Sequence, residues 1–199
     1  MNLKATAAVS NFIGCFSCGL ELAGILPPFS GKLMSIQFIV IHSSAFVFFI
    51  PFMNIPESFK PAVLKALIAG YTCAAFYVDG IFGILQFAGL TYAAYSGYVL
   101  KRDGEAARIP LILRWAGAFA VFIVSMAVIG APSDVDKWAG DRRLALMGVV
   151  YFGLIGLLEA SHVYEAGWKN LLRRIAQKDP QFREHMPGWL AKELYKQEK

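Results

Sequence analysis

A run of about forty mostly apolar residues, 61–100, constrains this chain more than any other feature. The run holds Lys65 near its start and one acidic residue, Asp79, near its middle. A helix of that length would extend roughly 60 Å, twice the hydrocarbon thickness of a bilayer. Because Asp-Gly is a turn signal, the Asp79-Gly80 pair favours a hairpin of two spans, residues 62–78 and 81–100. The alternative is one long helix of which half extends beyond the membrane. It avoids a tight reversal in lipid, where the backbone groups freed from the helix would need other hydrogen-bond partners.

The composition indicates that lipid surrounds much of the chain. Hydrophobic residues make up 57% and charged residues 17% of the 199 positions, whereas soluble domains have about 45–50% and about 25%. The excess lies in long apolar runs, which is typical of membrane proteins. The sequence therefore predicts an all-α fold, a polytopic integral membrane bundle of five or six transmembrane helices.

Four further apolar segments flank the hairpin. They cover residues 5–26, 33–52, 109–129 and 144–164. Pro27 and Pro28 end the first segment, because proline lacks the donor that a helix needs. The first segment is predicted to be retained as a helix, since it is too long and too polar for a cleavable signal. The hairpin brings the total to six spans, and a single long helix would leave five.

The C-terminal part differs in kind, so two units are predicted: a transmembrane bundle, residues 1–164, and a basic tail, residues 165–199. The stretch 168–178 has the pattern of an amphipathic helix, and a second short helix is expected over 187–196. Such helices lie on anionic membrane lipids or dock a protein partner by their apolar face. The candidate contact residues are Trp168, Lys169, Leu172, Arg173, Arg174, Trp189 and Leu194.

Charge sets the predicted orientation. The tail carries eight Lys and Arg and the stretch 101–114 carries four, whereas residues 134–143 balance three acids with three bases. Cytoplasmic segments carry the excess of Lys and Arg, so we predict a multi-pass protein of the inner cell membrane with a cytoplasmic C-terminus. The formal net charge of +5 does not indicate nucleic-acid binding, since no basic-aromatic module is present.

Ionisable residues in the apolar segments are the first functional candidates. They are Glu21, His42, Asp79, Glu159 and His162. A charge at membrane depth costs about 2.5–3.5 kcal/mol on insertion scales, so such residues suggest an ion or proton pathway. The structural alternative is that the three acids lie near helix ends, where the cost falls, and that His42 is a neutral histidine bonded to a neighbouring helix.

Two short motifs have both a chemical and a structural interpretation. Cys15 and Cys18 form a C-x-x-C, a spacing used in redox and metal sites, but here it lies inside an apolar helix where cysteine commonly packs. Glu159 and His162 form an E-x-x-H, which di-metal bundles use in two copies with further glutamates. One copy is present, so packing or a polar cluster is favoured, and we predict no cofactor and no metal.

No sequence motif identifies an activity. The chain has no Walker A loop, H-E-x-x-H, G-x-S-x-G or Rossmann glycine pattern. We therefore expect a non-enzymatic membrane anchor, sensor or scaffold, such as the membrane component of a defence or stress system. It is expected to self-associate through the Gly- and Ala-rich residues 81–100 and to engage a cytoplasmic partner or the inner leaflet through its tail. The alternatives are a small oligomeric channel or transporter and, third, a membrane redox or metal enzyme.

Overall fold

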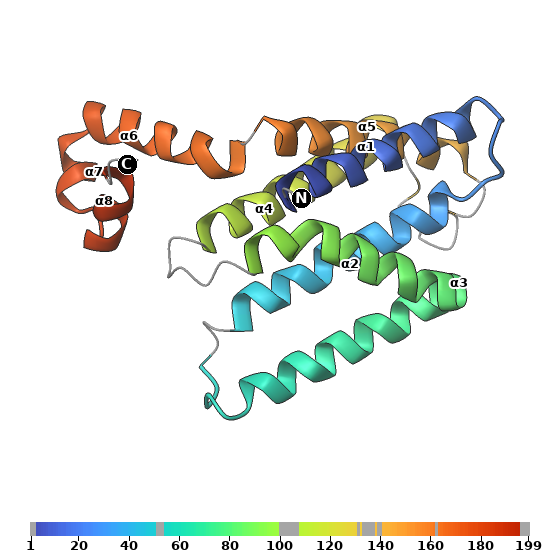
Figure 1. The fold of residues 1–199 in the computed structure, drawn as a ribbon, viewed down its shortest axis with the longest axis horizontal. Helices are drawn as coiled ribbons and strands as arrows, with labels where there is room; N and C mark the ends of the chain where they lie inside the picture. The colour runs from blue at the N-terminus through green and yellow to red at the C-terminus, as the bar shows by residue number, and fades with distance from the viewer. Residues whose placement is uncertain are drawn as a thin grey trace.

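The computed structural model describes residues 3–50, 54–99, 108–130, 132, 138, 141–161 and 163–195, and within these the fold is all-helical (Figure 1). Five helices form the bundle: α1 (Leu3–Leu22), α2 (Ser30–Phe49), α3 (Lys60–Val99), α4 (Arg108–Ile129) and α5 (Arg142–Ala160). A short π-helix, η4 (Val163–Gly167), leads into the tail helices α6 (Trp168–Lys178), α7 (Pro180–Glu184) and α8 (Gly188–Tyr195).

Helix α3 reverses direction at Asp79 and Gly80, so the reversal predicted at this pair is confirmed and the single long helix is wrong (Figure 1). Gly80 has φ +59° and ψ −140°, a conformation open to glycine alone. A Cβ on Gly83 would lie 2.0 Å from the carbonyl oxygen of Ala75. In a straight helix those residues would be about 12 Å apart. The two limbs of α3 therefore touch just beyond the hinge, and glycine at position 83 permits that contact.

Glycines also allow α1 and α5, the first and last bundle helices, to pack closely. A Cβ on Gly148 of α5 would lie 2.4 Å from Sγ of Cys18 on α1. A Cβ on Gly156 would lie 2.9 Å from the ring of Phe12. Small residues at a helix interface let the two backbones approach in this way. The α1–α5 contact is the most extensive between two helices of the bundle.

In the described part of the chain, two clusters of buried side chains form the core. The larger joins α1, α2, α4 and α5, and its most enclosed members include Phe122, Met147, Tyr151 and Phe152. The smaller lies between α2 and α3 and contains Ile36, Val40, Ala75 and Phe87. Helix α2 contributes to both clusters, which places it centrally in the bundle.

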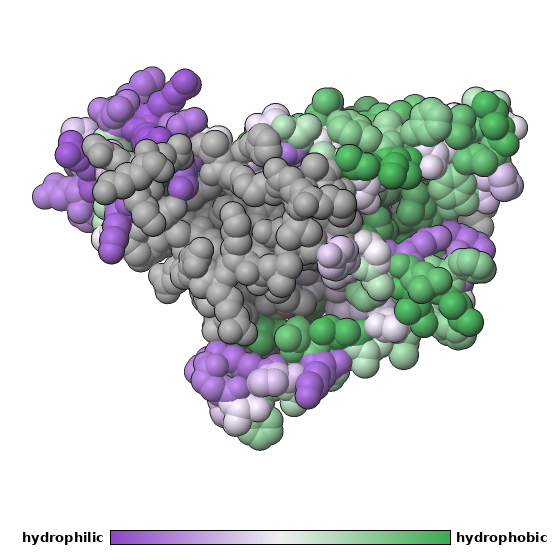
Figure 2. All heavy atoms as spheres, viewed as in Figure 1, coloured by the Kyte–Doolittle hydropathy of each residue, from purple (hydrophilic) through white to green (hydrophobic). Residues whose placement is uncertain are grey.

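The outside of the bundle is apolar. Large hydrophobic side chains with more than half of their surface exposed occur on α1, α3, α4 and α5; they include Phe16, Tyr77, Phe82, Val128 and Leu157. Figure 2 shows hydrophobic residues over the part of the bundle farthest from the tail, and hydrophilic residues gathered on the tail and at the start of α3. Among the described residues, three helical segments are long and apolar enough to cross a membrane: Lys60–Tyr92, Leu111–Ile129 and Arg142–Ala160. That number is smaller than the five or six spans predicted from the sequence.

The tail folds on itself beyond the end of α5. Figure 1 shows α6 continuing away from the bundle, with α7 and α8 beside its far end. Nε of Arg173 on α6 donates a hydrogen bond of 2.6 Å to the carbonyl oxygen of Leu194 on α8. Leu194 and Ala176 are buried, and the Asp179 carboxylate caps α7 by accepting from the backbone N–H of Gln181. Both helices predicted in the tail are present, and α7 between them was not predicted.

Candidate functional site

A buried ion pair joins α4 and α5 inside the bundle. The Arg114 guanidinium donates through Nε to Oε1 of Glu159, and the two side chains are only 7% and 6% exposed. Arg114 lies six residues into α4 and Glu159 is one residue from the end of α5. A charge in this apolar setting is stable only with such a partner, so each residue accounts for the presence of the other.

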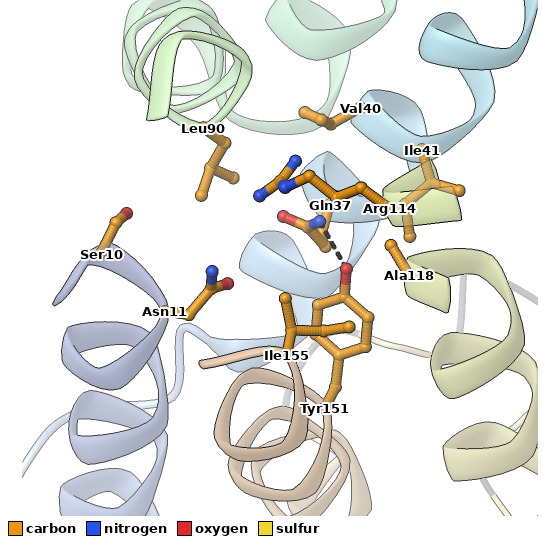
Figure 3. A pocket seen from close by; sticks show the side chains of 10 residues that line it. All are labelled: Ser10, Asn11, Gln37, Val40, Ile41, Leu90, Arg114, Ala118, Tyr151 and Ile155. Carbon is orange, nitrogen blue, oxygen red and sulfur yellow. Dashed lines mark hydrogen bonds between the residues drawn. The ribbon is translucent and has the colours of Figure 1, made fainter. Parts of the chain in front are cut away.

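A small polar cavity lies next to Arg114. It has a volume of about 20 Å³, enough for one water molecule. Figure 3 shows the polar side chains of Ser10, Asn11, Gln37 and Arg114 around it, contributed by α1, α2 and α4. Nε2 of Gln37 donates a 2.7 Å hydrogen bond to the hydroxyl of Tyr151, which ties α2 to α5. The interior of the bundle therefore holds a group of polar side chains around this cavity.

Tyr164 extends this polar region into the π-helix η4. Its side chain is 5% exposed, and its hydroxyl has no hydrogen-bond partner among the described atoms. A Cβ on Gly117 of α4 would lie 2.8 Å from that hydroxyl, so glycine makes room for it. An unpaired buried hydroxyl costs about 1–3 kcal/mol of folding stability. Single-turn π-helical segments often occur at functional sites. Within the described part of the bundle, the buried charges of Arg114 and Glu159 and the buried hydroxyl of Tyr164 are therefore the strongest candidates for a functional site.

Glu21 has a clear structural role. Its carboxylate accepts hydrogen bonds from the backbone N–H groups of Phe29 and Ser30, at 3.1 and 2.8 Å, and from the Ser30 hydroxyl at 2.8 Å. These donors belong to the start of α2, where backbone N–H groups lack partners within the helix. Glu21 therefore caps α2 and fixes the turn after α1, which explains why this acid is buried.

The other ionisable candidates lie in separate places. Asp79 forms an ion pair with Lys32 at the hinge of α3. His42 is exposed on the side of α2, where its ring centroid lies 5.6 Å from those of Phe38 and Phe46. His162 lies outside the described residues. Within the described chain, Glu21, His42, Asp79 and Glu159 thus do not converge on one pathway.

Cys15 and Cys18 are free thiols at the α1–α5 interface. Cys18 is fully buried against Gly148, and Sγ of Cys15 would lie 3.4 Å from a Cβ on Gly153. Among the described residues, no three His, Cys, Asp or Glu side chains are grouped to hold a metal ion. The position of both cysteines supports the packing interpretation of the motif.

The tail candidates divide into inner and outer residues. Leu194 is in the interior of the tail, and Arg173 holds α8 in place through its backbone contact. Lys169 and Leu172 are half-buried, and Arg174 is exposed. The side chains of Trp168 and Trp189 lie outside the described part of the structure. Two apolar residues not named among the candidates, Leu171 and Ile175, remain 59% and 37% exposed.

No family model, curated protein or solved structure matches this chain. The interpretation of the site therefore rests on its own geometry.

Arg114 was missed as a site residue, although its place along the chain indicated its depth in the bundle. It lies 15 residues before the end of α4, and Glu159 lies 17 residues after the start of α5. Two neighbouring antiparallel helices place such positions at the same depth.

Proposed function

We propose that this protein is a membrane anchor that crosses the bilayer six times and presents its tail to a cytoplasmic protein. Six apolar helical limbs support this number: α1, α2, the two limbs of α3, α4 and α5. Helices α1, α2, α4 and α5 have 20, 20, 22 and 19 residues, close to the roughly 20 residues needed to span a bilayer. An even number of crossings puts both termini on one side, and the basic tail favours the cytoplasm.

The observation that carries the proposal is the exposed apolar edge of α6. Leu171 and Ile175 lie one turn apart and remain exposed, although Ala176 on the same helix is buried and Arg173 binds α8. Arg174 and Lys178 lie beside them on the outer face. An apolar pair bordered by cations matches an amphipathic partner that carries acidic residues. In Figure 1, α6 continues away from the bundle. Its exposed edge is therefore more accessible to a soluble protein than to the lipids of the inner leaflet.

Self-association is part of the same proposal. The second limb of α3 exposes Ile81, Phe82 and Leu85 on the outside of the bundle. Gly89 on that limb has open space where a Cβ would lie, so a second copy could approach closely there. Gly83, in contrast, is already used within the chain by its contact with Ala75.

The polar cavity beside Arg114 is the one observation that favours the second function, a small channel or transporter. Its volume of about 20 Å³ accommodates a water molecule but no solvated ion. His42 and Asp79, the other pathway candidates, lie away from it on the outside of α2 and at the hinge. Ion flux in proteoliposomes that disappears in His42→Ala or Asp79→Asn would support this function over the anchor.

Photocrosslinking in native membranes tests the anchor. A photoreactive residue replaces Leu171 in the full chain, and cells are irradiated before the membranes are washed at high pH. We expect one discrete adduct with a soluble protein, lost in Ile175→Glu and retained in Gln177→Glu, an exposed position that adds the same charge. Adducts with lipid alone would refute the docking of a protein. Recovery of the unmodified chain in the soluble fraction would refute the membrane anchor itself.

A further inference from the structure

An apolar groove runs along the outside of α4 and α5. Val121, Val124 and Val128 of α4 form one wall, and Val150 and Leu154 of α5 form the other. Its volume is about 320 Å³, within the range of about 300–1,000 Å³ seen for small-molecule sites. Val124 and Val128 are 59% and 80% exposed, so the groove is open along its side. An occupant that enters from the surrounding lipid meets no barrier.

The length of the groove matches one leaflet. Its lining extends from Ala120 to Ile129 on α4, which at 1.5 Å per residue is about 14 Å. Half of a typical hydrocarbon core is about 15 Å. The groove therefore begins near the middle of the bundle and ends where α4 ends, the depth that a single acyl chain occupies.

A pair of opposite charges lies next to the end of the groove. Nη1 of Arg143 donates a 2.8 Å hydrogen bond to the carbonyl oxygen of Gly130, directly after the last lining residue of α4. Arg143 shares the α5 face of Val150 and Leu154, at spacings of seven and eleven residues. Nη2 of Arg143 also donates at 2.7 Å to the Asp141 carboxylate, and the Arg143 side chain is 54% exposed. Hydrogen bonds from Arg143 hold the pKa of Asp141 below its ordinary value, so both groups are charged at neutral pH.

We propose that this groove binds a zwitterionic phospholipid of the leaflet on the α4–α5 loop side. The acyl chain lies between α4 and α5, Arg143 donates to the phosphate, and Asp141 accepts from an ammonium group of the headgroup. A charged pair next to a chain-length groove complements a headgroup that carries both signs, such as phosphoethanolamine. The inference rests on the membrane embedding proposed above, and it concerns a surface other than the tail.

Native mass spectrometry of the detergent-purified full chain tests this site. After delipidation, the protein is titrated with phosphatidylethanolamine, phosphatidylglycerol or diacylglycerol. We expect one bound phosphatidylethanolamine per chain, with binding reduced about tenfold in Arg143→Gln because a charge-assisted hydrogen bond is lost. Val124→Trp, which fills the groove, should abolish binding, and Val9→Trp, at a 54% exposed position on α1, should leave it unchanged.

Three results would overturn the proposal. Equal retention in Val124→Trp and Val9→Trp would show general contact with surrounding lipid. Equal binding of all three lipids would remove the role of Arg143 and Asp141. Tighter binding of phosphatidylglycerol would show that the groove prefers an anionic lipid to a zwitterionic one. The membrane fraction of each variant is measured in parallel, so that failure of the membrane anchor is distinguished from failure of the groove.

Discussion

Replacing Arg114 with methionine removes one half of the buried ion pair and leaves the Glu159 charge inside the bundle. Both side chains are more than nine-tenths buried, so solvent screens their interaction little. Breaking such a pair by removing one partner costs about 3–5 kcal/mol, whereas replacing both partners with apolar residues is often neutral or stabilising. We therefore expect Arg114→Met to lose about 3–5 kcal/mol and the double variant Arg114→Met/Glu159→Met to recover most of it.

Thermal unfolding of the purified protein in detergent measures this effect. A loss of that size lowers the Tm by roughly 6–20 °C for a chain of this length. Lys32→Met is the matched control, because it breaks the Lys32–Asp79 pair, whose lysine side chain is 53% exposed. Exposed pairs are worth about 0–1 kcal/mol. If Arg114→Met costs no more than Lys32→Met, or if the Arg114 and Glu159 substitutions add independently, the two charges are not coupled and the reasoning fails.

Two further predictions concern glycines. Gly148→Ala should cost about 1–3 kcal/mol of stability by overpacking, since its Cβ would lie 2.4 Å from Sγ of Cys18. Cys18→Ala should relieve this cost in a double-mutant cycle measured by denaturation in mixed detergent. Additive costs of the two substitutions would contradict the contact. Gly80→Val should cost about 1–3 kcal/mol of stability, because Gly80 has a positive φ. Gly70→Ala, at a helical position with open space, should instead gain up to about 1 kcal/mol. Equal Tm values for the two variants would argue against the hinge.

Local features of the chain could be predicted from the sequence, and contacts between helices could not. Asp79-Gly80 predicted the hinge because a turn signal interrupted an apolar run that was too long for one span. The packing of Cys18 was predicted from its apolar neighbours. The Arg114–Glu159 pair was missed because outward-facing and core-facing positions of the bundle are both apolar, so periodicity does not reveal which faces meet. The cap by Glu21 was missed because it depends on how the chain turns back after α1.

The close α1–α5 contact has a consequence for biosynthesis. The partner of α1 is the last bundle helix to leave the ribosome, more than a hundred residues after α1 itself. Until then, the surface of α1 around Cys18 lacks its most extensive native neighbour, and contacts this distant along a chain form slowly. A nascent chain arrested before α5 would therefore expose an incomplete interface, which quality-control proteases could recognise. Assembly of the bundle is complete only when the first and last helices meet.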